Sequence, residues 1–313
     1  MTLISSCESV PCWVKATGIT LVGFADLMAR SVEIQPSFVV LLRLWRAGTS
    51  IMKLNGKSRV KTRAFTLIEL LVVVAIIALL MAILLPALER AREQGKRAVC
   101  LNNVHTLTVA WTMYCDDFDG ILPKAYTDTE GWIQDIPGFY RNPEEAPEAL
   151  QLEALRGGTL FPYLRTTKIF RCPVAPELRT YSITHAMNGF QSDGGTIVRQ
   201  LMEIRHPAHR IVVLDDFIRD WDACWMVCWS QPKWWNTTPI RHGYGNVFSF
   251  ADGHSEYWKW QDQRTIDLAI KCYGANTPEA RMYPESVQED NPDLMRVTRA
   301  VWGELGYTPS SPP

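Results

Sequence analysis

Two histidines and an aspartate lie close together in the last third of the chain, His242, Asp252 and His254. Imidazole nitrogens and a carboxylate are suitable ligands for zinc or iron, and the same groups can act as a catalytic pair. However, Asp252 precedes Gly253, and an Asp in a turn accepts hydrogen bonds from nearby backbone N–H groups. We therefore favour a structural role, in which Asp252-Gly253 makes a hairpin and His242 hydrogen-bonds across the loop. A metal site and a catalytic pair are the alternatives.

Other candidate ligands carry weaker signals. The pair Asp215-Asp216 follows an apolar run and offers oxygen ligands for calcium, although solvated carboxylates at a strand end are the commoner case. Cys224 and Cys228 are spaced for a local disulfide or a metal, but no second pair accompanies them. No pattern assigns Cys115 or Cys272. The sequence therefore predicts no cofactor, with calcium or zinc as the alternative.

Tryptophan is concentrated in one part of the chain, where seven of the twelve lie between 221 and 260. Trp221, Trp225 and Trp229 recur every four residues, a spacing that could form one face of a helix in an inserted loop. Exposed Trp side chains stack on sugar rings or anchor protein partners, whereas buried ones would form the core of the domain. We favour the core and keep a carbohydrate-binding or cargo-binding surface as the alternative.

Several function classes are disfavoured. The chain has no Walker loop, dinucleotide fingerprint, Gly-x-Ser-x-Gly elbow or His-Glu-x-x-His motif. Its 32 Lys and Arg residues balance 33 Asp and Glu residues, and 47% of residues are hydrophobic. This composition argues against a disordered chain and against a basic nucleic-acid-binding protein. We predict no enzymatic activity and no nucleic-acid partner.

The elements that position these residues can be read from the pattern. Short apolar runs at 211–214, 246–250 and 254–260 predict strands, and the last two flank Ala251-Asp252-Gly253, a hairpin signal. We expect an antiparallel sheet in a head that is rich in Pro, Gly and Trp, packed on a preceding helix. The predicted fold class is α+β.

The overall charge balance hides two unlike parts. Residues 1–64 contain nine basic and three acidic residues, a net charge of +6, which leaves 23 basic and 30 acidic residues and a net charge of −7 in 65–313. Between the two parts lies a run of nineteen residues without a charge, Leu70 to Leu88. As a helix it would span about 28 Å, close to the hydrocarbon core of a bilayer.

This apolar run is interpreted as a retained membrane anchor. A core helix that is apolar on every face would need protein on all sides. A cleaved signal peptide has a shorter apolar run and a small-residue exit, which Pro86, Leu88 and Glu89 do not provide. The five basic residues of 53–63 should stay cytoplasmic by the positive-inside rule, which places the body outside.

A long helix is expected to continue past the anchor. Pro86 removes one helix hydrogen bond and should bend or break the helix there. Beyond it, 89–114 contains strong helix formers with apolar residues at roughly helical spacing, Val99, Val104, Leu107 and Trp111. The pattern predicts one helix from Phe65 to about Cys115, ended by the turn signal at 116–120, whose second half is amphipathic.

The segment from Arg63 to Val73, RAFTLIELLVV, resembles the processing site of type IV prepilins and type II secretion pseudopilins. The resemblance implies that a prepilin peptidase cuts between Ala64 and Phe65, that Phe65 is methylated, and that Glu69 directs packing into a filament. Pro86 falls where such pilins often carry a helix-bending Pro. A carboxylate near the end of an apolar helix is costly in lipid unless it is paired, and a neighbouring subunit's N-terminal amine would pair with it.

The leader departs from the family pattern in two ways. Ala64 replaces the usual Gly before the cut, so we expect slower processing. A leader that began at Met1 would be too long, whereas a start at Met52 gives thirteen basic-rich residues of the familiar type. We therefore expect residues 1–51 to be an upstream extension and 52–64 to be the leader.

A second resemblance concerns the head. His242 and Asp252-Gly253 enclose nine residues, as in the prepilin-processing-associated domain whose signature is His, nine residues, Asp-Gly. Further segments similar to that subfamily are Cys100-Leu101-Asn102-Asn103, Asp119 to Pro123, Phe170-Arg171-Cys172-Pro173 and Phe250 to His254. The resemblance places cysteines at Cys100 and Cys172 and implies a disulfide between them, which suits an exported body.

Together these observations predict a pilin-like fold: a membrane-spanning half-helix at 65–88, an amphipathic half at 89–118, an α+β head at 119–302 and a flexible tail at 303–313. The expected function is that of a non-enzymatic pilin or pseudopilin subunit. Its expected partners are prepilin peptidase, other pilin-type subunits, a secretion or pilus assembly machine and the lipid bilayer. We expect a single-pass inner-membrane protein whose head is periplasmic or extracellular. A membrane-anchored binding module and an anchored metal-dependent hydrolase are the alternatives.

Overall fold

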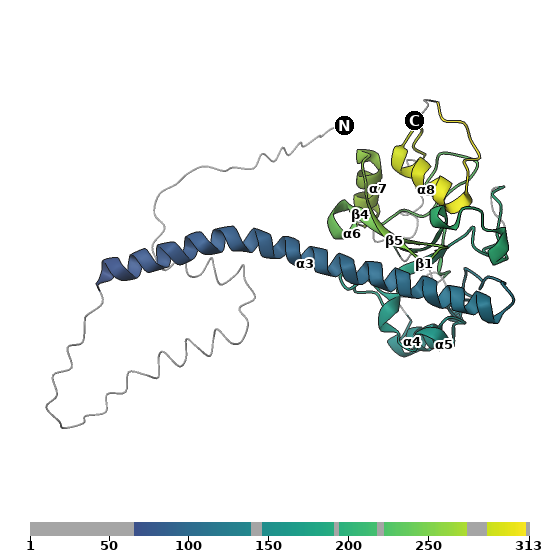
Figure 1. Cartoon of the computed structure of the whole chain (residues 1–313), viewed down its shortest axis with the longest axis horizontal. Helices are drawn as coiled ribbons and strands as arrows, with labels where there is room; N and C mark the ends of the chain where they lie inside the picture. Colours follow the sequence, from purple (N-terminus) through teal and green to yellow (C-terminus); the bar gives the residue numbers. More distant parts are fainter. Residues whose placement is uncertain (1–65, 139–145, 191–193, 218–221, 274–286, 311–313) are drawn as a thin grey trace, which may run out of the picture. The chain divides into compact units, whose positions relative to one another are not determined.

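A computed structural model describes residues 66–138, 146–190, 194–217, 222–273 and 287–310 of the chain. Its first element is the helix α3, which runs from Leu67 to Asp117 over 51 residues (Figure 1). The long helix predicted from Phe65 to about Cys115 is thus confirmed within two residues at each end. Pro86 lies inside α3 and does not break it, so the helix tolerates the loss of one backbone hydrogen bond.

Five strands form a single sheet in the order β3-β1-β2-β4-β5. Their bounds are β1 Tyr181–Thr184, β2 Ile211–Asp215, β3 Cys224–Trp225, β4 Gly245–Phe250 and β5 Ser255–Lys259. The pairs β1/β2, β2/β4 and β4/β5 are antiparallel, whereas β1 and β3 pair in parallel. The sheet is therefore mixed, which corrects the expectation of a purely antiparallel one. The predicted strands correspond to β2, β4 and β5.

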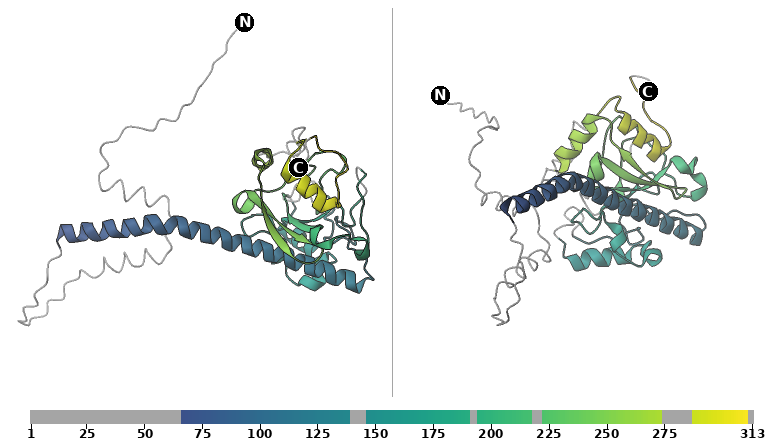
Figure 2. Two further views of the ribbon diagram at one scale, coloured as in Figure 1. Left: turned by 45° about the horizontal axis from the view of Figure 1, so that its top comes forward. Right: turned by 60° about the vertical axis from the view of Figure 1, so that its left-hand side comes forward.

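The sheet separates two layers of helices (Figure 2). The second half of α3 covers one face, and α7 (Gln263–Tyr273) and α8 (Pro292–Trp302) cover the other. Alternation along β4 explains this arrangement, because successive side chains of a strand point to opposite faces. Val247 belongs to the hydrophobic cluster that contains Leu107 and Trp111 of α3, and Phe248 belongs to the cluster that contains Leu294 of α8.

The second half of α3 presents a buried stripe to the sheet. Its buried apolar residues recur at helical spacing, Cys100, Val104, Leu107, Trp111 and Cys115. Val99, which the sequence pattern placed in this stripe, is exposed. Polar contacts accompany the apolar ones. Thr108 meets Ser249 of β4, and Nδ1 of His105 lies 2.7 Å from the carbonyl oxygen of Gly253.

The remaining elements are short. They are α4 (Glu148–Gly157), α5 (Phe161–Leu164), the turn α6 (Arg241–Tyr244) and the 3-10 helices η2 (Lys168–Phe170), η3 (Leu201–Glu203) and η4 (Pro207–His209). The predicted flexible tail is not free along 303–310, because the N–H of Gly306 donates to the carbonyl of Trp229 and that of Ser310 donates to Asp290. This part of the tail packs on the head.

Candidate functional site

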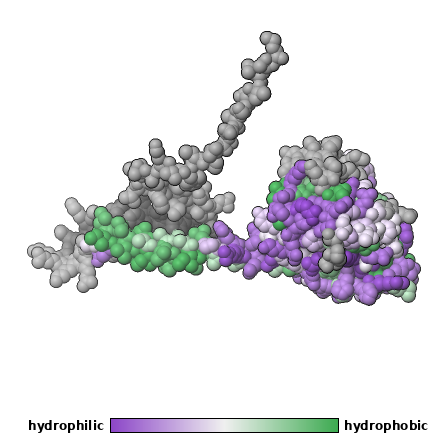
Figure 3. All heavy atoms as spheres, turned by 90° about the horizontal axis from the view of Figure 1, so that it is seen from above, coloured by the Kyte–Doolittle hydropathy of each residue, from purple (hydrophilic) through white to green (hydrophobic). Residues whose placement is uncertain are grey.

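The first half of α3 is an apolar surface that no other described part of the chain covers. Sixteen large apolar side chains between Leu67 and Leu88 are exposed, and none of the residues in the most apolar window of the helix is buried. Figure 3 shows this half as hydrophobic and the part of α3 nearer the head as hydrophilic. α3 is the one helix among the described residues that is long and apolar enough to cross a membrane. Among the described residues, nothing surrounds this half of α3 as a buried core helix would require.

The predicted processing residues lie at the edge of the described chain. Ala64 and Phe65 fall outside the described residues, so the cut and the methylation stay predictions. Glu69 lies exposed in the first turn of α3. A carboxylate there also interacts favourably with the positive end of the helix macrodipole. Glu69 thus has a local role in the single chain, beside the assembly role that the resemblance implies.

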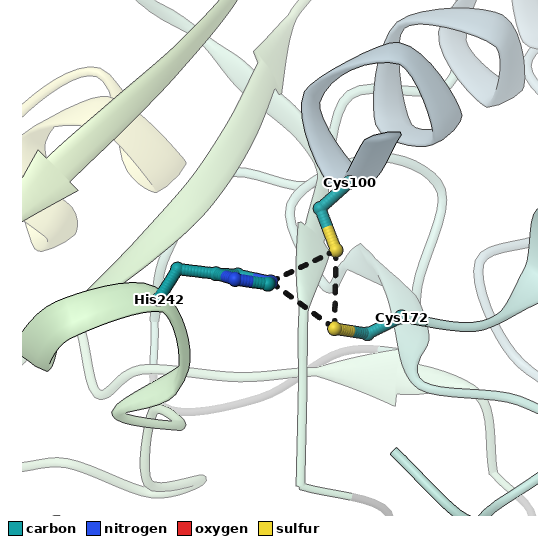
Figure 4. A group of neighbouring side chains, drawn as sticks. All are labelled: Cys100, Cys172 and His242. Carbon is teal, nitrogen blue, oxygen red and sulfur yellow. Dashed lines mark hydrogen bonds between the residues drawn. The ribbon is translucent and has the colours of Figure 1, made fainter. Parts of the chain in front are cut away.

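Three side chains from distant parts of the sequence converge where α3 meets the head. Cys100 lies on α3, Cys172 follows η2, and His242 lies in α6, directly before β4. In Figure 4 the three point toward one another. Nε2 of His242 is 3.0 Å from Sγ of Cys100 and 3.2 Å from Sγ of Cys172, and the two sulfurs are 3.1 Å apart. Among the described residues, this is the one group of three such side chains placed to hold a metal ion.

The orientation of the His242 ring is fixed from two sides. Its Nδ1 lies 2.8 Å from Oε1 of Glu93, a residue of α3 that is half-exposed. Its backbone adopts φ +61°, followed by Gly243 at +86° and Tyr244 at +61°. Residues other than glycine rarely adopt the left-handed region, so this conformation costs free energy at His242 and Tyr244. The chain therefore turns sharply at this point, and the turn aims the imidazole at the two sulfurs.

The cluster is buried, and polar side chains contact it. Cys100 and Cys172 are fully buried, and His242 is nearly so. The hydroxyl of Tyr181 donates to Sγ of Cys100 at 3.2 Å, and Asn103 donates to the Tyr181 hydroxyl. Burial in such surroundings strengthens every electrostatic interaction within the cluster.

The hydrogen bond between the two cysteines moves their pKa values in opposite directions. The hydrogen bond from Cys100 lowers the pKa of Cys172 to about 5, against the opposing effect of burial, and His242 and the backbone N–H of Val174 lower it further. The pKa of Cys100 is correspondingly raised, first by the hydrogen bond with Cys172 and then by burial. Burial lowers the pKa of His242, but the hydrogen bonds with Cys172 and Glu93 outweigh it, so the net pKa is raised. The pKa of Cys172 is therefore lowered and that of Cys100 raised, with their mutual hydrogen bond as the largest cause of both shifts.

His242, Asp252 and His254, which the sequence offered as an alternative metal site, do not come together among the described residues. His242 belongs to the cysteine cluster, whereas Asp252 and His254 lie in the β4–β5 turn, where Oδ1 of Asp252 accepts from the N–H of His254 and also contacts its ring. Gly253 has φ +95°, as the predicted turn requires. The contacts therefore favour a structural role for Asp252-Gly253.

Glu93 and Tyr181 were not predicted from the sequence as neighbours of the cluster. Glu93 precedes Cys100 by seven residues, which is two helical turns, so both residues lie on one face of α3.

The carboxylates suggested for calcium are already engaged. Oδ1 of Asp215 accepts from Nη1 of Arg241 at 2.7 Å, and Oδ2 of Asp216 accepts from the Ser182 hydroxyl at 2.8 Å. Both aspartates are buried. Burial raises the pKa of Asp215 to about 6, although Arg241 acts to lower it. The expectation of solvated carboxylates is thus wrong, and the pair serves an internal polar network instead of a calcium site.

The tryptophans are mostly core residues. Trp225 lies in β3 and not on a helix, so the predicted helical face is wrong, and its side chain is fully buried against Trp234. Trp229 is half-buried beside Gly194 and Gly306, and Trp221 lies outside the described residues. The predicted helix is absent there because Cys224 and Trp225 form strand β3, which pairs with β1.

Two of the other cysteines are also buried. Sγ of Cys224 lies 3.4 Å from Nδ1 of His185, and Cys115 is buried on α3.

Comparison with known proteins adds one finding. Residues 59–85 match the family model of the prokaryotic N-terminal methylation motif. No curated protein and no solved structure matches the chain. The matched residues include both sides of the predicted cut, Glu69 and most of the apolar half of α3. The chain therefore carries the prokaryotic N-terminal methylation motif of prepilin-type proteins, followed at once by a long apolar helix.

Proposed function

We propose that this chain is a type IV pilin-like or pseudopilin subunit. It is cut by prepilin peptidase between Ala64 and Phe65, methylated on Phe65 and assembled with other pilin-type subunits. The observation that carries the proposal is the methylation motif at 59–85, followed by the helix α3. The first half of α3 is apolar and exposed, and its second half packs against the head. Pilin-type subunits are structural proteins, and we extend the proposal to a non-enzymatic role for this chain.

The exposed half of α3 needs a partner surface. Burying a large aliphatic side chain fully contributes about 1.5–3 kcal/mol, so the sixteen half-exposed side chains represent on the order of 20 kcal/mol. Lipid covers this surface before assembly, and neighbouring α3 helices cover it in a filament. A single helix of this kind satisfies its own backbone hydrogen bonds in either setting.

Glu69 pairs with the N-terminal amine of a neighbouring subunit during assembly. After the cut, the new N-terminal amine stands four residues before this carboxylate. Within an apolar bundle of helices, an amine from one subunit and a carboxylate from the next neutralise each other, which offsets the cost of keeping either charge out of water. The basic residues of the leader keep the N-terminus in the cytoplasm, so the head is on the outer side of the inner membrane.

N-terminal analysis of the membrane-extracted protein tests the proposal. The chain is co-expressed with an active prepilin peptidase, and its mature end is determined by mass spectrometry. The expected product begins at Phe65 and carries one added methyl group. Cells without the peptidase serve as the control and should yield only the unprocessed chain. An intact leader in cells whose peptidase processes a standard prepilin would contradict the proposal.

A further inference from the structure

The cluster at the junction of α3 and the head has the composition of a metal centre. Two cysteine sulfurs and one imidazole nitrogen form a nearly equilateral triangle with sides of 3.0, 3.1 and 3.2 Å. Thiolate and imidazole are the ligands that soft or borderline d10 cations prefer in proteins. We propose that Cys100, Cys172 and His242 bind one thiophilic metal ion, Zn²⁺ or Cu⁺, which fastens α3 to the head.

The distances suit an ion after a small expansion. Zinc binds sulfur at about 2.3 Å and imidazole nitrogen at about 2.0 Å, so tetrahedral geometry separates neighbouring ligand atoms by roughly 3.5–3.8 Å. The present S–S distance of 3.1 Å is about 0.7 Å shorter than the tetrahedral value, and the two S–N distances are shorter by about 0.3 and 0.5 Å. Side-chain rotations of this size need no change in the backbone. A fourth position stays open to a small ligand at a zinc ion, whereas Cu⁺ is satisfied by three ligands.

The imidazole is held as a metal ligand requires. The Glu93 carboxylate lies 2.8 Å from Nδ1 of His242 and, when ionised, can only accept. In the neutral ring the proton therefore stays on Nδ1, and the lone pair of Nε2 faces both sulfurs. A carboxylate on the far nitrogen is the usual outer partner of a metal-bound histidine. Tyr181 supplies a second outer contact, because its hydroxyl donates to Cys100.

A disulfide between Cys100 and Cys172 is the competing outcome, and the position of His242 argues against it. A disulfide needs no third partner, and its sulfurs are weak acceptors. It would leave Nε2 of a buried imidazole without a good hydrogen-bond partner, which costs free energy. The sulfurs would also have to approach from 3.1 Å to about 2.05 Å. Metal binding instead uses all three side chains.

The ion would join three segments that are far apart in the chain. Cys100 and Cys172 are 72 residues apart, and Cys172 and His242 are 70 apart. One ligand lies on α3, one precedes β1 and one precedes β4. Tension on α3 would therefore be carried into the sheet at two points. The role is mechanical and independent of how the leader is processed.

Metal analysis of the full-length chain tests this inference. The protein is purified in detergent without chelators, and its zinc and copper are measured by plasma mass spectrometry. The expected result is one ion per chain, with X-ray absorption at the metal edge giving two sulfur neighbours and at least one imidazole nitrogen. A zinc edge or a copper edge identifies which ion is bound. Metal-free protein, whether its cysteines are linked or free, or an ion without sulfur neighbours, overturns the inference.

Variants locate the site. Cys100→Ser, Cys172→Ser and His242→Gln should each weaken binding on the order of 100-fold or more, measured by competition with a chromophoric chelator. Cys115→Ser is the matched control, because Cys115 is also a buried cysteine of α3 but lies outside the cluster. Equal loss in this control would contradict the assignment. If a ligand variant does not fold, a second experiment takes its place, in which Co²⁺ is exchanged into the unaltered protein. Absence of sulfur-to-cobalt charge-transfer absorption then overturns the inference.

Discussion

Nδ1 of His242 lies 2.8 Å from Oε1 of Glu93, so a residue of α3 sets the direction in which a loop side chain of the head faces the two cysteines. Further along the chain, the carbonyl oxygen of Gly253 lies 2.7 Å from Nδ1 of His105, a residue of the same helix. β4 runs between these two contacts. The segment from His242 to Gly253 therefore contacts α3 at both of its ends.

The Glu93 contact leads to a first prediction, which rests on the proposed metal site. Glu93→Ala should lower metal affinity by roughly 10- to 100-fold, because the imidazole loses the carboxylate that orients it. Glu93→Gln should recover part of this loss, since its amide oxygen still accepts from Nδ1. Chelator competition measures both. Glu89→Ala, a change of a nearby exposed glutamate of α3, is the control, and a loss no larger than in this control would show that Glu93 does not position the ring.

The buried ion pair of Asp215 and Arg241 makes a second prediction. Arg241→Met should cost roughly 3–5 kcal/mol of unfolding free energy at pH 8, because it leaves a buried carboxylate unpaired. Glu177→Gln is the control: Glu177 is 44% exposed and 3.9 Å from Arg241, so its change should cost less than about 1 kcal/mol. Urea unfolding followed by circular dichroism measures both.

The same variant should show a pH dependence of defined sign. The pKa of Asp215 is already raised to about 6 by burial, and loss of Arg241 raises it further. Below that value the folded variant holds a proton that the unfolded chain releases above about pH 4. The stability of Arg241→Met should therefore fall as pH rises from about 4 through 6. A variant that is equally destabilised at pH 5 and pH 8 would rule out the carboxylate as the cause.

Trp225 makes a third prediction, because its burial assigns it to the core. Trp225→Ala should destabilise the protein by about 3–5 kcal/mol through the cavity it leaves. Trp235→Ala should change stability by only about 0.5 kcal/mol, since Trp235 is 41% exposed. Thermal and urea unfolding of the two variants give the comparison. Similar small effects at both positions would mean that Trp225 is not packed as described.

Glu69 makes a fourth prediction, on assembly. Glu69→Gln should leave membrane insertion and cutting intact but weaken subunit incorporation, because the neighbouring amine loses its counter-charge. A buried pair worth about 3 kcal/mol corresponds to roughly 100-fold per contact. The assembled fraction is measured by shearing filaments from cells. Glu89→Gln, just beyond the apolar run, should assemble normally; equal assembly by both variants would remove Glu69 from the interface.

The leader makes a fifth prediction. Ala64→Gly should increase the rate at which the leader is removed. The substitution places glycine, the smallest residue, before the cut, as prepilin-type leaders usually have. Pulse-chase labelling measures the processed fraction over time. Ala64→Lys is the opposite variant and should block processing. Equal rates for the unaltered chain and the Ala64→Gly variant would show that this position does not limit the cut.

The sequence by itself determined the anchor, the motif and the long helix. These depend on residues that are adjacent in the chain: the contiguous apolar run after Glu69 and the helical spacing of Val104, Leu107 and Trp111. The β4–β5 hairpin was predictable for the same reason, since Gly253 permits the turn locally. Such features need no knowledge of what lies across the fold.

Only the tertiary structure decided the rest. The strands β1 and β3 have four and two residues and owe their pairing to neighbours in the sheet, not to a local pattern. Trp225 is buried because β3 joins that sheet, although its spacing from Trp229 suggested a helix. Cys100, Cys172 and His242 meet because α3 crosses the sheet where two loops end. Such contacts arise from packing between segments that are distant in the sequence, so the spacing of residues along the chain does not specify them.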